Sequence, residues 1–421
     1  MKIAVIGNSA AAISAIETFR KYDQKSDIVL ISREKHHPYS RVLLPYLLLG
    51  QIDHHGLFYR PASFYDQMNV KAFLGRSVVK IDTQGKKLYL DDDSKVPFDK
   101  LLISSGSSPV KPSIPGLDDE RIGYLWTIED AVRINQHIKE KKHLLIIGGG
   151  NISLMLAWVA FQRKMKVTVV ELLDQVMPQI LDKKAAEMLE GEISKTGTRV
   201  LTGTVIEKIE KSPKGYYLVF PANLSSFRAD LIIVAAGVKS NIGFVNKDHI
   251  DMDKGILVND KMQTSIPDIY AAGDVAQGLT AWGDPPSIHA LWTTAVEHGR
   301  VAGANMAEKD VHYQGSLGSS VSEFFHMTVA SIGKLQESSS VVGKEYFSSK
   351  RKLYIKLFLE DDIPVGGIMI GSPEDISTFG ILKTYILKKK TIPNLEILMT
   401  PAIRPIWPLD STLHNNNAAE A

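Results

Sequence analysis

The stretch LLIIGGGNISLMLAWVAFQRKMKVTVVE, residues 144–171, decides the fold of this chain. Its first four residues are apolar, too few for a helix and typical of a buried parallel strand. Three glycines then turn the chain into an apolar-rich segment of helical length, and a second apolar run ends on Glu171. Strand, glycine turn, helix, strand and acid together predict a dinucleotide-binding βαβ unit.

Each part of this unit has a physical role. Gly148 permits a tight turn, and Gly150 lets backbone N–H groups approach a pyrophosphate at the positive end of the helix. Glu171 follows Gly150 by about 20 residues, where a carboxylate can accept the hydroxyls of an adenosine ribose. Ser153 replaces the third glycine of the pattern, and a glycine-rich turn that binds no nucleotide is the alternative.

Length and composition limit the classes of protein to which this chain can belong. A chain of 421 residues is too long for one ordinary core and indicates two or three domains. Its 44% hydrophobic and 23% charged residues are typical of soluble globular proteins. Because the formal net charge is only +2, we expect neither nucleic acid nor a membrane as a partner.

The chain has no cysteine. This excludes disulfides, thiolate nucleophiles and any zinc site or iron–sulfur cluster ligated by cysteines of this chain. Residues 1–15 superficially resemble a signal peptide, but Asn8 and Ser9 interrupt the apolar run. No apolar run is long enough to span a bilayer, and the lack of cysteine fits a reducing compartment. We therefore predict a cytoplasmic protein.

A second, degraded copy of the βαβ unit begins the chain. Residues 2–6 predict a strand, a turn at Gly7 leads into a helix that ends near Lys21, and residues 28–31 predict the next strand. Small residues replace the two later glycines, which gives G-x-S-x-x-A. Glu34 lies just beyond the second strand, with Ser32 as a competitor for the ribose. The start of an unrelated doubly wound domain stays an alternative.

Short apolar runs punctuated by glycine and proline predict further strands. They comprise meanders at 71–90 and 200–220 and buried strands at 101–103 and 231–234, with a proline-marked boundary at 109–115. A short strand from Ile269 ends on Asp274, which suits a ribityl or phosphate-linked hydroxyl; the alternative is a helix N-cap. From residue 312 strand pairs at 352–359 and 365–370 precede a helix, and the polar tail from Asn415 is predicted to be disordered.

The order of these features resembles the pyridine-nucleotide disulfide oxidoreductase superfamily. Matching segments occur along the whole chain, at 3–12, 101–106, 148–153, 235–237, 264–276 and 289–307. The resemblance implies an α/β fold of two Rossmann-like dinucleotide-binding domains, an FAD domain with an inserted NAD domain, plus a small C-terminal α+β domain. The implied boundaries are 1–112 and 238–312 for the FAD domain, 113–237 for the NAD domain and 313–421 for the C-terminal interface domain with its disordered tail.

The resemblance also implies which residues bind the cofactors. For FAD they are Gly7, Ser9, Ala10, Ala12, Glu34, Arg41, Ser105, Gly106 and Asp274, and for NAD they are Gly148, Gly150, Asn151, Ile152, Glu171 and Gly237. No Arg or Lys lies beside Glu171, whose charge would repel a 2′-phosphate, so we expect NADH rather than NADPH. No catalytic acid or base and no metal site is assigned. Trp292 is expected near the flavin and nicotinamide, with a core tryptophan as the alternative.

Two departures from the family pattern bear on function. In thiol-dependent members a redox cysteine precedes an L-P-Y segment, and Val42 takes that place here. A thiol relay is therefore excluded, and electrons must leave through the flavin. Met155 replaces the Glu that many relatives place near the nicotinamide. The chain thus resembles the thiol-free branch, which includes rubredoxin and ferredoxin reductases, the flavin part of nitrite reductase and the NADH-linked flavoprotein (epsilon) subunit of phenylglyoxylate dehydrogenase.

We therefore expect an NADH-dependent flavoprotein oxidoreductase that moves electrons between NAD(H) and an iron–sulfur protein or subunit, within a hetero-oligomeric complex such as a 2-oxoacid dehydrogenase. The alternatives are a stand-alone rubredoxin or ferredoxin reductase, an oxidase, and a non-catalytic scaffold that keeps the fold. The basic run Lys383–Lys390 is a candidate dock for an acidic iron–sulfur partner, with a solvated helix face as the favoured alternative.

Overall fold

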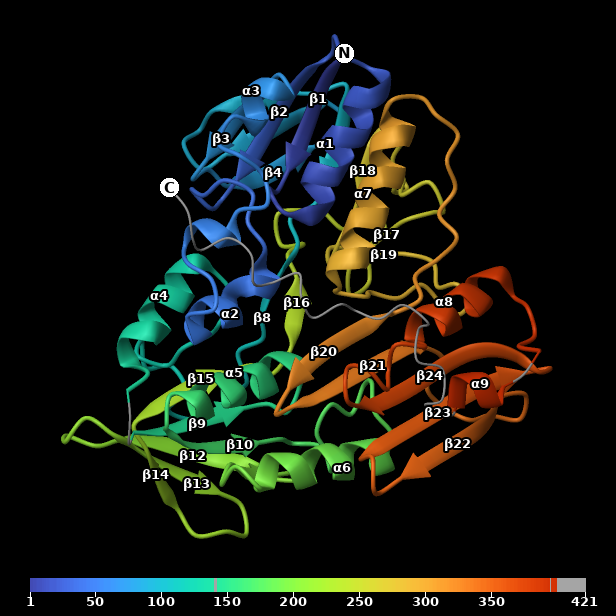
Figure 1. The fold of residues 1–421 in the computed structure, drawn as a ribbon. Coiled ribbons are helices and arrows are strands. Elements are labelled where there is room, and N and C mark those ends of the chain that lie inside the picture. The colour runs from blue at the N-terminus through green and yellow to red at the C-terminus, as the bar shows by residue number, and fades with distance from the viewer. Residues whose placement is uncertain (140–141, 394, 400–421) are drawn as a thin grey trace, which may run out of the picture. The chain divides into compact units, whose positions relative to one another are not determined.

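The structure is a computed structural model that describes residues 1–139, 142–393 and 395–399 (Figure 1). The chain forms two compact units, Met1–Ser320 and Val321–Ala421. The tail from Asn415, predicted to be disordered, lies outside the described residues. The predicted division of the chain into four segments stays a proposal.

A parallel sheet organises the N-terminal part of the first unit. Its strand order is β18-β7-β1-β2-β3, with β1 (Lys2–Ile6), β2 (Asp27–Ser32), β3 (Val70–Leu74), β7 (Lys100–Ile103) and β18 (Ile269–Ala271). Helix α1 (Ala10–Tyr22) connects β1 to β2. The apolar strands are buried on both faces, as expected of a parallel sheet covered by helices.

A second parallel sheet follows in the inserted part of the chain. Its order is β11-β10-β9-β15, with β9 (His143–Ile147), β10 (Lys166–Val170), β11 (Arg199–Leu201) and β15 (Leu231–Val234). Helix α5 (Asn151–Gln162) connects β9 to β10, and α6 (Lys183–Ser194) precedes β11. The stretch 144–171 is thus the predicted βαβ unit.

The two parallel sheets repeat one topology, because β7-β1-β2-β3 has the same connectivity as β15-β9-β10-β11. A three-stranded antiparallel sheet follows the edge strand in each repeat. These sheets are β4 (Val78–Asp82), β5 (Lys87–Leu90) and β6 (Lys95–Pro97) in the first repeat, and β12 (Ile206–Lys211), β13 (Tyr217–Pro221) and β14 (Phe227–Ala229) in the second. The predicted meanders therefore start too early, because the first strand of each pairs in the parallel sheet.

Helix α7 (Trp292–Met306) lies along α1 beside the first sheet (Figure 1). Two glycines permit this close approach. A Cβ atom at Gly299 would lie 2.3 Å from the Ala11 carbonyl oxygen, and one at Gly303 would lie 2.2 Å from that of Ala15. Since the residue numbers rise together along both helices, their N-termini point the same way, toward the carboxyl ends of the strands.

Two short strands cross between the repeats, β8 (Ser107–Pro109) and β16 (Val238–Ser240), which pair antiparallel. The remaining short elements of this unit are η1 (Arg41–Leu43), α2 (Leu44–Leu49), η2 (His55–Leu57), α3 (Phe64–Gln67), α4 (Ile128–His137), β17 (Ile256–Leu257) and β19 (Ala276–Gln277). No helix of the described residues is both long enough and apolar enough to cross a membrane.

The second unit is an α+β domain. Its sheet has the order β20-β21-β24-β23-β22, with β20 (Ser320–Phe324), β21 (Met327–Gly333), β22 (Val342–Ser348), β23 (Leu353–Glu360) and β24 (Ile363–Gly371). Helix α8 (Phe379–Lys388) packs on β24, and α9 (Glu396–Met399) follows. The predicted fold class, two Rossmann-like domains plus a small C-terminal α+β domain, is confirmed.

Candidate functional site

The residues predicted to bind FAD converge at one edge of the first sheet. Gly7 follows β1, Glu34 follows β2, Ser105 and Gly106 follow β7, and Asp274 follows β18. Because these strands are parallel neighbours, their carboxyl ends meet at the same edge. This is the position where open α/β sheets bind their ligands.

The first glycine turn is shaped for close backbone approach. Gly7 has φ +110°, and a Cβ atom there would lie 2.1 Å from the Ser104 carbonyl oxygen, so no other residue fits. Ser9 is the N-cap of α1, yet its side chain makes no capping hydrogen bond. Ala10 and Ala12 are buried in the first turn. The helix end therefore has N–H groups that suit a phosphate, with no bulky side chain in the way.

Asp274 lies mostly buried at this edge. The Ser107 hydroxyl donates to its Oδ2 at 2.6 Å, and the Ser240 hydroxyl donates to its backbone carbonyl at 2.6 Å. Burial raises the pKa of Asp274, and the bond from Ser107 opposes that shift. The N-cap alternative is wrong, since β19 and not a helix follows Asp274. A buried carboxyl of this kind suits a hydrogen bond to a cofactor hydroxyl.

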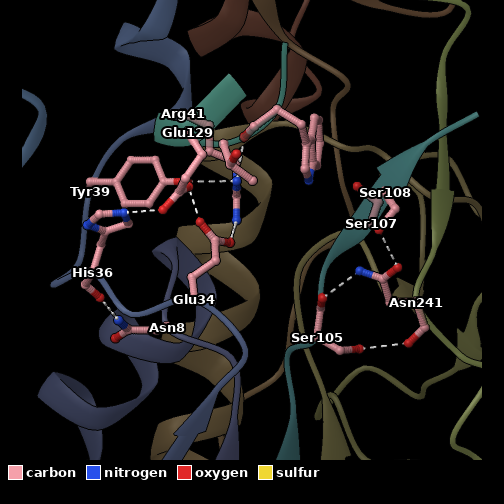
Figure 2. Close-up of polar contacts among 12 residues, drawn as sticks. Asn8, Glu34, His36, Tyr39, Arg41, Ser105, Ser107, Ser108, Glu129 and Asn241 are labelled. Atoms are coloured by element: carbon pink, nitrogen blue, oxygen red, sulfur yellow. Dashed lines mark hydrogen bonds and ion pairs between the residues drawn. The ribbon is translucent and has the colours of Figure 1, made fainter. Parts of the chain in front are cut away.

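Asn241, which sequence reasoning missed, holds the Ser105–Gly106 turn in place. The Ser105 hydroxyl donates to the Asn241 carbonyl at 2.9 Å, and the Asn241 amide donates back to the Ser105 carbonyl at 2.9 Å (Figure 2). The Ser108 hydroxyl donates to the Asn241 side-chain oxygen at 2.7 Å. A Cβ atom at Gly106 would meet nothing within 4 Å, so the turn borders open space. Asn241 belongs to no motif and could be found only in the structure.

Glu34 and Arg41 are brought together as an ion pair (Figure 2). The Tyr39 hydroxyl donates to the second carboxylate oxygen of Glu34 at 2.5 Å, and Arg41 donates to Tyr39 at 2.9 Å and to the Trp126 carbonyl at 2.5 Å. Burial raises the pKa of Tyr39, so its hydroxyl stays a donor. Each Glu34 oxygen keeps a lone pair for a ribose hydroxyl. Tyr39 was not among the predicted residues, although it lies only two residues before Arg41.

Hydrogen bonds in the same region connect the first glycine turn to helix α4. The Asn8 amide donates to the His36 carbonyl at 3.0 Å, and His36 Nε2 lies 2.6 Å from Glu129 in the first turn of α4 (Figure 2). The Tyr65 hydroxyl donates to the Asn8 side chain at 3.0 Å. The adenosine end of the predicted FAD site is therefore bonded to the start of α4.

The residues predicted to bind NAD converge in the same way at the second sheet. Gly148 has φ +112°, and a Cβ atom there would lie 2.4 Å from the Ala235 carbonyl oxygen. Gly150 is the N-cap of α5, which Asn151 and Ile152 begin, and Gly237 follows β15. A Cβ atom at Gly150 or Gly237 would meet nothing within 4 Å, so open space faces this helix end. The cradle fits a dinucleotide diphosphate.

Glu171 is fixed by backbone donors on both sides. Its Oε2 accepts from the Gly149 N–H at 2.5 Å and its Oε1 from the Leu173 N–H at 2.8 Å. A Cβ atom at Gly149 would lie 2.9 Å from the Glu171 side chain, so the middle glycine, overlooked in the sequence, leaves room for this carboxylate. Among the described residues, no Arg or Lys forms an ion pair with Glu171.

Two residues that depart from the family pattern, and the tryptophan expected near the flavin, have defined places in the structure. Ser153 is fully buried, and its hydroxyl lies 3.4 Å from the Ala235 carbonyl oxygen, so a serine fits where the motif has glycine. Val42 is 53% exposed. Trp292 begins α7, partly buried, with its ring edge-on to Tyr59 at 5.0 Å between centroids. The described residues contain no group of three or more His, Cys, Asp or Glu placed to hold a metal ion.

Comparisons with known proteins agree with this arrangement. The family model described as pyridine nucleotide-disulphide oxidoreductase matches residues 1–299, and the model of the rubredoxin NAD+ reductase C-terminal domain matches residues 323–390. The chain is 30% identical to the NADH-dependent phenylglyoxylate dehydrogenase subunit epsilon of Aromatoleum evansii, over 94% of this chain and 93% of that protein.

Two further relatives are similar over most of their length. An NADH oxidase of Methanocaldococcus jannaschii is 29% identical, over 96% of this chain and 95% of that protein. The solved structure of NADH:rubredoxin oxidoreductase from Clostridium acetobutylicum matches with a TM-score of 0.75 and 26% identity, over 94% of this chain and 97% of that chain.

Proposed function

Because the chain belongs to the pyridine nucleotide-disulphide oxidoreductase family, we propose that it moves electrons between NAD(H) and an iron–sulfur carrier, as a subunit of a larger complex such as a 2-oxoacid dehydrogenase. The coarser prediction, an NADH-dependent flavoprotein oxidoreductase with FAD and NAD(H) as cofactors, is confirmed by the family and by the relatives. The cytoplasmic location stays a prediction.

One observation supports the proposal most strongly: two dinucleotide cradles are present in a chain without cysteine. FAD bound in the first cradle would supply the conversion between two-electron hydride transfer and one-electron transfer. Val42 stands where thiol-dependent relatives have their redox cysteine, so no protein thiol can take those electrons. An external carrier is then the natural acceptor or donor.

The residues of this chain bind and position rather than react. Glu171 would hold the adenosine ribose of NADH, and the N-terminus of α5 its diphosphate. Glu34, oriented by Arg41 and Tyr39, would hold the FAD ribose, and Asp274 a hydroxyl nearer the flavin ring. These assignments all concern the first unit. They require no side chain to act as a general acid or base.

The iron–sulfur partner is supported by a family model and by a relative. Residues 323–390 match the rubredoxin NAD+ reductase C-terminal domain, and the NADH-rubredoxin oxidoreductase of Clostridium acetobutylicum is 28% identical over 94% of this chain. The phenylglyoxylate dehydrogenase relative is a subunit of an NADH-dependent enzyme, which supports a role within a complex. A second candidate function is direct reduction of O2, favoured by the similarity to an NADH oxidase over 96% of this chain.

Anaerobic stopped-flow mixing separates these functions. Purified protein reconstituted with FAD should lose its flavin absorbance on mixing with NADH, and a second mix with rubredoxin or ferredoxin should restore it faster than a mix with air-saturated buffer. Faster reoxidation by O2 would favour the oxidase. A colourless protein that does not bind added FAD would be a scaffold, and this result would refute both catalytic functions.

A further inference from the structure

The outer surface of α8 in the second unit has a composition that a solvated helix does not explain. We propose that this surface, the α8 patch, docks an acidic iron–sulfur protein; it consists of Ile381, Lys383, Leu387, Lys388, Lys389 and Lys390. The proposal rests on the proposed function and names the part of the chain that its electron partner contacts.

The packing of α8 determines which residues face solvent. Leu382 and Ile386 are buried against the sheet, 0% and 4% exposed. On β24, a Cβ atom at Gly367 would lie 2.6 Å from the Leu382 side chain, so the glycine makes room for this anchor. Residues three apart share a helix face. Ile381 and Leu387, three residues on either side of the exposed Thr384, therefore lie on the outer face of α8.

Two large aliphatic side chains are exposed on this face. Ile381 is 40% exposed and Leu387 is 54% exposed. They lie on either side of Thr384 within a helix of ten residues, and we call this exposed pair the apolar centre. A helix face that only met water would be expected to have polar residues at these positions.

Lysines lie beside this apolar centre, one within the helix and three at its C-terminal end. Lys388, Lys389 and Lys390 are exposed and Lys383 is half-buried, and within the described part of the chain none of the four takes part in an ion pair. Lys389 ends the helix with φ +50°, and the chain continues through Lys390. The helix dipole favours a cation in the last turn, which accounts for Lys388. It does not account for the exposed aliphatic residues or for lysines beyond the helix.

An apolar centre with a charged rim is the anatomy of a docking surface. The sign of the rim selects an acidic partner, and cysteine-ligated iron sites themselves contain several thiolates. Complementary charge chiefly raises the association rate, as a short-lived electron-transfer complex requires. The patch also lies within residues 323–390, which match the rubredoxin reductase C-terminal domain. With two aliphatic residues, the face is too small for a membrane anchor.

Three variants test the proposal with rubredoxin and an acidic ferredoxin as probes. The first, Lys388→Glu/Lys389→Glu/Lys390→Glu, reverses the rim, and the second, Ile381→Ser/Leu387→Ser, removes the apolar centre. The matched control reverses three exposed lysines of the first unit that have no ion pair among the described residues, Lys21→Glu/Lys25→Glu/Lys254→Glu. NADH-dependent reduction of each probe is measured at low and high salt, and p-benzoquinone, a neutral acceptor that needs no dock, reports flavin turnover.

We expect the rim variant to reduce the iron–sulfur probes about tenfold more slowly at low salt and to lose most of the salt dependence. The Ser variant should raise KM for the probes and keep the salt dependence. Quinone reduction should stay at the wild-type rate in both, and the control should match the wild type throughout.

Other outcomes would overturn the proposal in distinguishable ways. If the wild type reduces the probes and the rim variant equals it within twofold at low salt, the dock is wrong and the proposed function stands. If the wild type reduces neither probe while reducing quinone, the proposed function fails and the dock fails with it. If light scattering shows a wild-type dimer that the Ser variant dissociates without slower probe reduction, the patch is a self-association surface instead.

Discussion

Replacing Glu171 by Gln tests why this chain should use NADH. The substitution keeps the shape of the side chain and removes its charge. The carboxylate is held by the N–H groups of Gly149 at 2.5 Å and Leu173 at 2.8 Å, so it cannot swing away from a cofactor bound at the carboxyl end of β10. NADPH would place a 2′-phosphate where NADH has a hydroxyl that this carboxylate accepts.

The size of the effect follows from Coulomb's law. At a separation of about 5 Å and an effective dielectric constant of about 20, each unit of phosphate charge is repelled by about 3 kcal/mol. That corresponds to a roughly 200-fold preference for NADH in kcat/KM. Among the described residues, no Arg or Lys pairs with Glu171 to reduce this repulsion.

The assay compares kcat/KM for NADH and NADPH with p-benzoquinone as acceptor. Glu171→Gln should bring the ratio down to roughly ten or less, mainly by improving NADPH. Adding Leu172→Arg, at a residue that is 64% exposed, should reverse the preference by pairing with the phosphate. Glu187→Gln, an exposed acid on α6, is the matched control and should leave the ratio unchanged.

The reasoning would be refuted by a Glu171→Gln enzyme whose NADH to NADPH ratio stays within twofold of the wild type. In that case shape, and not charge, would discriminate between the two cofactors. A ratio that falls only because NADH turnover falls would also contradict the repulsion argument.

Asp274→Asn should weaken FAD binding by roughly ten- to a hundredfold, because a charge-assisted hydrogen bond is lost, and flavin fluorescence titration measures this affinity. The FAD-free variant should be as stable as the FAD-free wild type, which calorimetry measures. Gly299→Ala should lower the free energy of unfolding by roughly 1–3 kcal/mol in denaturant titrations, because its Cβ atom would lie 2.3 Å from the Ala11 carbonyl oxygen. Gly191→Ala is the control: its Cβ atom would meet nothing within 4 Å, so the substitution should cost no stability. Burial, helped by the nearby His289, lowers the pKa of His298 to about 4. Below pH 6.5 the unfolded chain therefore binds a proton that the folded chain does not bind, and the free energy of unfolding falls by about 1.5 kcal/mol between pH 6.5 and 5. His298→Phe should remove this part of the pH dependence, and equal slopes in both proteins would contradict the assignment.

Local patterns identified much of the molecule because their causes are local. Apolar runs of four residues, glycine turns and terminal acids are signatures of single βαβ units, so both units were predicted correctly. Glu171 directly follows β10, and its role in binding NADH stays a prediction. The place of Asp274 at a strand end was predicted for the same reason. Its N-cap alternative failed because the chain after Asp274 forms the short strand β19, which no short-range pattern signals.

Pairing partners were less predictable. Residues 70–74 and 78–90 look alike as alternating strands, yet the first pairs parallel with β2 and the others form a separate antiparallel sheet. An alternating pattern indicates which side chains of a strand are buried, but it does not indicate which other strand pairs with it. The contacts of Asn241 with Ser105 and Ser108 depend on the crossing of β8 and β16, more than 130 residues apart in the chain.

The sequence by itself determined the two nucleotide cradles and the absence of any thiol relay, because glycine geometry, strand length and the lack of cysteine are properties of the chain alone. Only the tertiary structure decided that Gly149 makes room for Glu171, that Tyr39 and Arg41 orient Glu34, and that Ile381 and Leu387 face outward. These facts depend on which distant surfaces pack together, and that choice is made by the burial of whole faces rather than by neighbouring residues.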